Sequence, residues 1–313
     1  MRIIFMGTPE FALSVLKKLY LDKNHEIICV VTQPDKPKGR GHKIIFSPVK
    51  DFALKNNLKI MQPKKLKDPE VLEEFKRMQP DFFVVAAYGK IIPEEILSLP
   101  KYFALNIHGS LLPKYRGAAP INYAIINGEN VTGITLMRMD KGMDTGDIIS
   151  QATCEILPED NFGSLYNKLA EIGANELINF LDKLESGEIK DIDFKKQDDS
   201  LASYTSLIKK EFCKIEWSKS SREIINLVRG LDPKPGAFCF YKDKILKIWG
   251  LQDFNIYGNE KPGQIIAVNK NGFAVKTFDG ALLITKVQEQ GGKIMLTEDY
   301  LKGHKIELND FLV

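Results

Sequence analysis

The chain has 313 residues, a length that favours two domains because a single hydrophobic core rarely grows beyond about 250–300 residues. Hydrophobic residues make up 44% and charged residues 27%, close to the averages of globular domains, and no apolar run is long enough to span a membrane. The net charge of +3 is too small to indicate a nucleic-acid-binding protein by itself. Composition therefore predicts a globular protein without a membrane role.

The first residues predict a strand followed by a helix. Residues 2–6 (RIIFM) run directly into a turn at 7–10 (GTPE), and a helical pattern of apolar residues comes next. A strand at this position leaves no room for a secretory or transit signal, so we expect the protein in the cytoplasm. The turn lacks the second and third glycines of a dinucleotide-binding motif, which argues against a nicotinamide cofactor.

Four more apolar runs alternate with helical stretches, at 26–32, 81–87, 104–107 and 133–139. This alternation is typical of crossover connections and predicts an α/β domain with a Rossmann-like, largely parallel sheet over residues 1–184. Residues 185–206 are polar and charged with few apolar positions to bury, and we interpret them as a linker.

Residues 207–313 have the pattern of a second domain. Residues 220–223 (SSRE) form a predicted capping box that opens one helix. Short predicted strands with turn residues between them follow, at 238–241, 245–249, 263–268, 272–278 and 282–287. Such a series favours a small β-barrel of the oligonucleotide-binding (OB-like) type.

The cysteines carry no metal or redox signature. Cys29, Cys154, Cys213 and Cys239 stand far apart and form no Cys-x-x-Cys pair. We expect buried free thiols and no metal.

The segment with the most functional groups is 106–117 (NIHGSLLPKYRG), where a predicted strand gives way to a loop. Successive strand side chains alternate between faces, so Asn106 and His108 project together. Ligands of open parallel sheets bind beyond the carboxyl ends of strands, which is where this pair lies. A lone buried histidine is more often structural, and an aspartate beside glycine, such as Asp144, is ordinary in turns. On the residues alone both alternatives stay open.

Taken together, the NIHGSLLP segment, the following RG pair and the later DTG triplet resemble the formyltransferase family that uses 10-formyltetrahydrofolate. The resemblance implies that Asn106, His108 and Asp144 form the catalytic trio. It also implies that the formyl donor is 10-formyltetrahydrofolate and that the reaction needs no metal.

The same resemblance implies a folate site beside the trio. One part is the loop after the strand, composed of Ser110, Leu111, Leu112 and Pro113. The other is Tyr88 and Gly89, in the segment that resembles the family's pterin-side strand and loop. On the residues alone, the first segment is also compatible with a structural loop. The second is a weaker match, because buried strands often have this pattern.

The acceptor of the formyl group is indicated by a basic loop at 32–43 (TQPDKPKGRGHK). A solvated charged loop is the simplest interpretation, although flanking glycines and cations suit contact with phosphates. The loop resembles the insertion by which the methionyl-tRNA branch of the family engages the acceptor stem. This resemblance implies that Arg40, Lys38 and Lys43 bind tRNA and that the acceptor is initiator methionyl-tRNA, giving N-formylmethionyl-tRNA.

The resemblance covers nearly the whole chain, including the predicted barrel. This second domain distinguishes the chain from single-domain members of the family. Basic residues of that domain suit a phosphate-facing surface, namely Lys209, Lys210, Lys214, Lys219, Lys242, Lys244 and Lys247. One departure is Lys234, which stands between two prolines where the family more often has an aromatic residue.

Two other functions compete with formyl transfer to tRNA. A formyltetrahydrofolate hydrolase or dehydrogenase would use the same folate site with a different acceptor, and a non-catalytic tRNA-binding protein would leave the trio idle. The basic loop and the predicted barrel argue against the hydrolase or dehydrogenase, and the trio argues against the non-catalytic binding protein. We expect folate and tRNA as partners, and no membrane or obligate protein partner.

Overall fold

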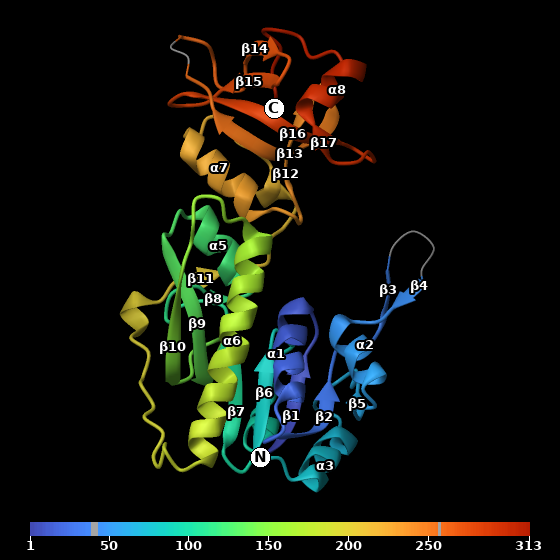
Figure 1. Ribbon diagram of the computed structural model, residues 1–313, viewed down its shortest axis with the longest axis vertical. Helices are drawn as coiled ribbons and strands as arrows, with labels where there is room; N and C mark the ends of the chain where they lie inside the picture. The colour runs from blue at the N-terminus through green and yellow to red at the C-terminus, as the bar shows by residue number, and fades with distance from the viewer. Residues whose placement is uncertain (39–42, 256–257) are drawn as a thin grey trace. The chain divides into compact units, whose positions relative to one another are not determined.

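The computed structural model describes residues 1–38, 43–255 and 258–313 (Figure 1). The chain forms two compact units that are not continuous in sequence. The first contains Met1–Pro120, Val131–Glu155 and Tyr166–Thr205, and the second contains Ile121–Asn130, Ile156–Leu165 and Ser206–Val313. Two short pieces that come before residue 166 therefore belong to the second unit.

The first unit is built on a seven-stranded sheet. In order across the sheet, its strands are β10 (Ile148–Glu155), β9 (Val131–Arg138), β7 (Phe103–His108), β6 (Phe82–Ala86), β1 (Arg2–Gly7), β2 (Glu26–Val31) and β5 (Ile60–Met61). Strands β7, β6, β1, β2 and β5 are parallel, whereas β9 and β10 are antiparallel to their neighbours. The predicted largely parallel sheet is confirmed.

Helices cover both faces of this sheet. They are α1 (Glu10–Leu21), α2 (Pro48–Lys55), α3 (Pro69–Met78), α4 (Glu94–Leu97) and α6 (Phe162–Glu185). Phe82 and Phe83 are consecutive on β6 and point to opposite faces: the ring of Phe82 lies 6.3 Å from Phe180 of α6, and that of Phe83 lies 5.3 Å from Phe75 of α3. Burial on both faces explains why this strand is apolar throughout.

Two small ribbons accompany the main sheet. Strands β3 (Lys36–Lys38) and β4 (Lys43–Ile45) pair antiparallel, and β8 (Arg116–Gly117) pairs in parallel with β11 (Tyr204–Thr205). The 3₁₀ turn η1 (Asp199–Leu201) comes just before β11. The later part of the segment 185–206 therefore lies along the first unit.

The second unit contains an antiparallel sheet. Its strands are β12 (Ala237–Tyr241), β13 (Lys244–Asp253), β16 (Ala281–Glu289), β15 (Gly272–Lys276) and β14 (Ile265–Asn269), with β17 (Met295–Leu296) paired to β16. Its helices are α5 (Pro120–Ile126), the 3₁₀ turn η2 (Glu211–Cys213), α7 (Ser221–Gly230) and α8 (Thr297–Gly303). The side chains of Ser220 and Glu223 form the predicted capping box of α7.

Two expectations from composition can be compared with this structure. Cys29, Cys213 and Cys239 are buried as expected, whereas Cys154 on β10 is half-buried. Among the described residues, no helix has the length and apolar character needed to cross a membrane.

Candidate active site

The end of strand β7 carries two polar side chains on one face of the sheet. Asn106 and His108 are 8% and 6% exposed, and between them Ile107 points the other way, against Gly173 of α6. Since β7 is parallel to β6 and ends at His108, the pair lies at the carboxyl edge of the parallel strands. This is the edge where ligands of open α/β sheets bind.

Asp144 comes to the same place from the loop after β9. Its φ of 55° is left-handed, a conformation that aspartate adopts more readily than most residues. Its Oδ2 lies 3.6 Å from Nδ1 of His108 and accepts a hydrogen bond from the backbone N–H of Gly117 at 2.8 Å. Its Oδ1 accepts from Nδ2 of Asn106 at 3.5 Å. The three residues predicted as a trio therefore converge.

The ring of His108 lies between two acceptors. Nε2 is 3.0 Å from the carbonyl oxygen of Tyr115, while Nδ1 faces the carboxylate of Asp144. Tyr115 has a φ of 62°, and this turn brings its carbonyl back toward the ring. Both of these groups accept hydrogen bonds, so each ring nitrogen of His108 faces an acceptor.

The loop after β7 is held by its own hydrogen bonds. The hydroxyl of Ser110 is fully buried and donates to the carbonyl of Lys114 at 2.6 Å. Thr135 of β9 donates to the carbonyl of Ser110 at 2.7 Å and accepts from the N–H of Leu112 at 3.0 Å. Ser110 and Leu112 thus shape the loop, whereas Leu111 and Pro113 are partly exposed.

The ring of Tyr88 is buried after β6. It is 2% exposed, its hydroxyl has no hydrogen-bond partner among the described residues, and burial raises the pKa of Tyr88 to about 12. The backbone makes the polar contacts here, since Nε2 of Gln33 donates to the carbonyls of Tyr88 at 2.9 Å and Gly89 at 3.2 Å. Gly89 has a φ of 77°, and an added Cβ would lie 2.7 Å from that nitrogen.

Comparison with known proteins agrees with this geometry. Residues 1–181 match the family described as formyl transferase, and residues 207–305 match the formyl transferase C-terminal domain. Over 98% of its length the chain is 49% identical to the methionyl-tRNA formyltransferase of Caldanaerobacter subterraneus, covering 98% of that protein. The methionyl-tRNA formyltransferase of Clostridium novyi is 46% identical over 100% of both chains.

The chain belongs to the methionyl-tRNA formyltransferase family. It is therefore a formyltransferase, and enzymes of this family take the formyl group from 10-formyltetrahydrofolate.

Solved structures share the fold at lower identity. An N-formyltransferase from Helicobacter canadensis, in complex with folinic acid and dTDP-3-aminofucose, has a TM-score of 0.66 and 22% identity over 90% of this chain and 97% of its own. HypX from Aquifex aeolicus, in complex with tetrahydrofolic acid, has a TM-score of 0.63 and 20% identity over 100% of this chain and 50% of its own.

A second layer of contacts in this formyltransferase was not found from sequence. Gln197 lies in the segment interpreted as a linker, and its Nε2 donates to the carbonyls of Asp144 at 2.8 Å and Gly146 at 2.7 Å. Its Oε1 accepts from Nε of Arg116 at 3.0 Å, and Arg116 is itself 1% exposed. The buried guanidinium of Arg116 thus holds the side-chain amide of Gln197, and this amide in turn holds the backbone of the loop that carries Asp144.

Further bonds tie Arg116 to the same segment. It donates to Oδ1 of Asp199 at 2.7 Å and to the hydroxyl of Tyr204 at 3.2 Å. Burial lowers the pKa of Arg116, but the hydrogen bonds to Asp199 and Tyr204 outweigh burial and raise it above its usual value. Arg116 of the RG pair therefore holds residues 197–204 through buried hydrogen bonds, and the backbone of Gly117 donates to Asp144.

The predicted tRNA contacts of the basic loop remain predictions. Arg40 lies outside the described residues. Lys38 and Lys43 pair across the β3–β4 ribbon, which places both at the base of the loop.

The lysines of the second unit already have intramolecular contacts in several cases. Lys242 lies 3.2 Å from Asp310, and Lys244 lies 3.2 Å from Glu289. The ammonium of Lys247 donates to the carbonyl of Pro235 at 2.7 Å. Each of these three lysines therefore has a contact within the second unit.

Proposed function

We propose that this formyltransferase moves the formyl group of 10-formyltetrahydrofolate to the amino group of initiator methionyl-tRNA, giving N-formylmethionyl-tRNA for translation initiation. The convergence of Asn106, His108 and Asp144 carries the proposal, in a chain 49% identical over 98% of its length to a methionyl-tRNA formyltransferase. Because that product is used in translation, we place the reaction in the cytoplasm.

The chemical step begins when the amine nitrogen forms a bond to the formyl carbon. An α-amino group ordinarily has a pKa of about 8, so a neutral fraction is present without a strong base. Negative charge develops on the formyl oxygen, and N–H groups of Asn106 and His108 donate to it. Collapse of the adduct restores the carbonyl and breaks the bond between the formyl carbon and N10 of the folate.

Protons balance within this reaction, because the amine nitrogen loses one and N10 gains one. Either His108 or a water carries this proton. Nε2 of His108 lies 3.0 Å from the carbonyl of Tyr115, and we propose that the formyl oxygen replaces this carbonyl when folate binds. Asp144, 3.6 Å from Nδ1, orients the ring.

Folate and tRNA are assigned to different parts of the chain. We propose that residues 1–184 carry catalysis, with Leu111 and Pro113 contacting folate directly while Ser110 and Leu112 hold the loop. Tyr88 and Gly89 support the pterin side through their backbone. We further propose that the basic loop and residues 207–313 bind tRNA phosphates. Residues 185–206 connect the catalytic part to residues 207–313 in the sequence.

The test compares acceptors at fixed 10-formyltetrahydrofolate. Methionyl-tRNA, free methionine, an amino sugar nucleotide and buffer alone are supplied in parallel, and both tetrahydrofolate release and the formylated product are measured. We expect transfer to methionyl-tRNA with kcat/KM far above the other acceptors. Equal tetrahydrofolate release in buffer alone would instead identify a hydrolase, and binding of tRNA without turnover would identify a binding protein.

A further inference from the structure

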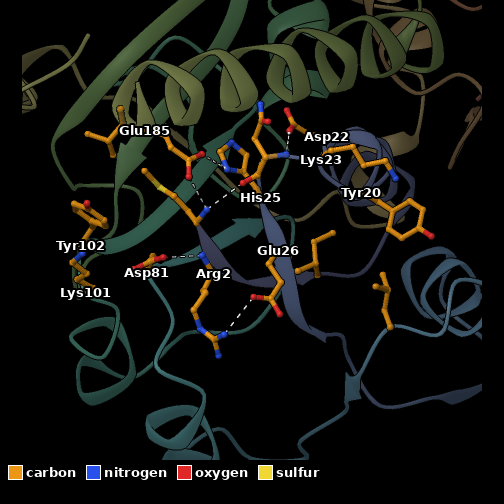
Figure 2. A pocket seen from close by; sticks show the side chains of 15 residues that line it. Arg2, Tyr20, Asp22, Lys23, His25, Glu26, Asp81, Lys101, Tyr102 and Glu185 are labelled. Atoms are coloured by element: carbon orange, nitrogen blue, oxygen red, sulfur yellow. Dashed lines mark hydrogen bonds and ion pairs between the residues drawn. The ribbon is translucent and has the colours of Figure 1, made fainter. Parts of the chain in front are cut away.

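A cleft lies at the end of the first unit's sheet where its parallel strands begin. It has a volume of about 780 Å³ and is lined where β1 and β2 begin, at Arg2 and Glu26, and where α6 ends, at Glu185 (Figure 2). The catalytic candidates lie where parallel strands end, so this cleft takes no part in the chemistry described above.

His25 is the buried polar group of this cleft. Its side chain is 0% exposed, and within the described part of the chain neither ring nitrogen makes a hydrogen bond. Nδ1 lies 3.2 Å from Oε2 of Glu185, and Nε2 lies 3.4 Å from Oδ1 of Asp182. Figure 2 shows the ring of His25 turned toward Glu185. A buried imidazole is therefore placed between two carboxylates without a hydrogen bond to either.

Asp22 brings a third group to the same point. One ligand atom each from Asp22, His25 and Asp182 lie within 4.8 Å of one another. Two ligands bound about 2.0–2.2 Å from a tetrahedral metal lie about 3.3–3.6 Å apart. The 3.4 Å between His25 and Asp182 already fits that spacing, and rotation of the half-buried Asp22 side chain completes the set.

Asp22 and Asp182 have no lysine or arginine as an ion-pair partner in the part of the chain that the structure describes. Asn24 supplies their hydrogen bonds: its backbone N–H donates to Oδ1 of Asp22 at 2.8 Å and its Nδ2 to Oδ1 of Asp182 at 3.2 Å. The amino group of Met1 lies 3.3 Å from Oε1 of Glu185. The N-terminal ammonium group therefore offsets part of the negative charge of Glu185, whereas Asp22 and Asp182 have no such partner among the described residues.

We propose that Asp22, His25 and Asp182 bind a divalent transition-metal ion, Zn²⁺ being the best match to one imidazole and two carboxylates. Nε2 of His25 is the nitrogen ligand. Nδ1 then carries the proton and donates to Glu185, the carboxylate–histidine–metal arrangement that orients ligating histidines. The ion joins the end of α6 to the loop before β2, and its role is to stabilise this edge of the sheet.

The experiment uses the full, untagged chain after treatment with a chelator. Zn²⁺ alone is titrated by calorimetry, and bound metal is counted after dialysis. We expect one ion per chain at this site, with affinity falling at least about tenfold in Asp22→Asn and in Asp182→Asn, and about 10–100-fold in Glu185→Gln. Zn²⁺ should also raise the Tm of the wild type more than that of the variants, because it binds the folded state.

These variants are chosen to keep the fold. Asparagine retains the oxygen that accepts from Asn24 at both positions, and both aspartates are partly exposed. The matched control is His304→Asn, which removes a half-exposed histidine 3.1 Å from Glu289 and should leave Zn²⁺ affinity unchanged. The proposal is overturned if the wild type binds no Zn²⁺, as expected of a simple imidazolium ion pair, or if Asp22→Asn and Asp182→Asn bind it as the wild type does.

Discussion

The contact between His108 and Asp144 can be tested by a double-mutant cycle. His108→Ala removes one donor to the developing oxyanion, and we expect kcat to fall about 10²- to 10³-fold, or about 2.7–4 kcal/mol. Asp144→Asn removes a carboxylate 3.6 Å from Nδ1 but keeps an oxygen that can accept from Gly117. Its effect therefore falls mainly on the orientation of the His108 ring.

Because Asp144 acts largely through His108, the two losses should not add. We expect Asp144→Asn to lower kcat by about 10- to 100-fold in the wild type and much less in the His108→Ala background, a coupling of about 1–3 kcal/mol. The assay is steady-state kcat and KM with 10-formyltetrahydrofolate and methionyl-tRNA, with folding checked by circular dichroism.

Asp140→Asn is the matched control for this cycle. Asp140 lies on the same loop and bonds to Gly142 and Thr145, so the variant removes the same charge without touching His108. Its kcat should stay near the wild type. The reasoning is refuted if the effects of His108→Ala and Asp144→Asn multiply, or if Asp140→Asn costs as much as Asp144→Asn.

Three further predictions follow from single residues. Arg40→Ala should lower kcat/KM for methionyl-tRNA and leave folate affinity near the wild type, since a guanidinium between glycines suits contact with nucleic acid; an unchanged kcat/KM would assign the loop to solvent. Gln197→Ala leaves the carbonyl of Asp144 without its donor, so kcat should fall about tenfold or more while folate KM changes little; a change in KM alone would contradict this. Tyr88→Phe removes a buried hydroxyl without a hydrogen bond among the described residues and should be neutral or stabilising. Burial raises the pKa of Tyr88 from 10.0 to about 12, so the wild type keeps its full stability below about pH 10 and loses part of it as the pH rises toward 12. Urea unfolding at about pH 9 and about pH 11 should show that the free energy of unfolding falls less in Tyr88→Phe than in the wild type. Equal falls would refute the raised pKa of Tyr88.

The central strands could be predicted from sequence because strands buried on both faces consist of continuous apolar residues. Strands such as β6 are covered on both faces and are apolar throughout, and so stand out from the polar loops. Strand β10 (IISQATCE) was not predicted, since most of its positions are half-buried or exposed and it lies at the edge of the seven-stranded sheet, next to β9. An edge strand of this kind reads as a polar loop until its partner is known.

The candidate site was partly predictable for a similar reason. Asn106 and His108 lie on a strand, where alternation fixes the face of each side chain. Tyr88 follows Ala87, whose φ of 45° breaks that alternation, so its burial could not be read from the pattern. Gln197 lies in a charged segment without periodicity, and its contact with Asp144 depends on the folded path of the chain.

Contacts between residues far apart in the sequence decide which compact unit a helix joins, and the sequence pattern does not show them. Helix α5 lies within the first half of the sequence, yet Nδ2 of Asn122 donates to the carbonyl of Gly230 at 2.7 Å, in the second unit. An added Cβ at Gly230 would lie 2.5 Å from Ile126, which shows how closely the two helices pack. Local patterns place α5 among its sequence neighbours and carry no information on this partner.

The fate of the formyl carbon in a single turnover tests the central claim most directly. The enzyme in excess is mixed with 10-formyltetrahydrofolate labelled in the formyl group and with initiator methionyl-tRNA, and the reaction is quenched over time. We predict that the label moves onto the methionyl amine at a rate matching tetrahydrofolate release, and that His108→Ala slows both together. Label recovered as free formate, or a His108→Ala rate equal to the wild type, would contradict transfer at this site.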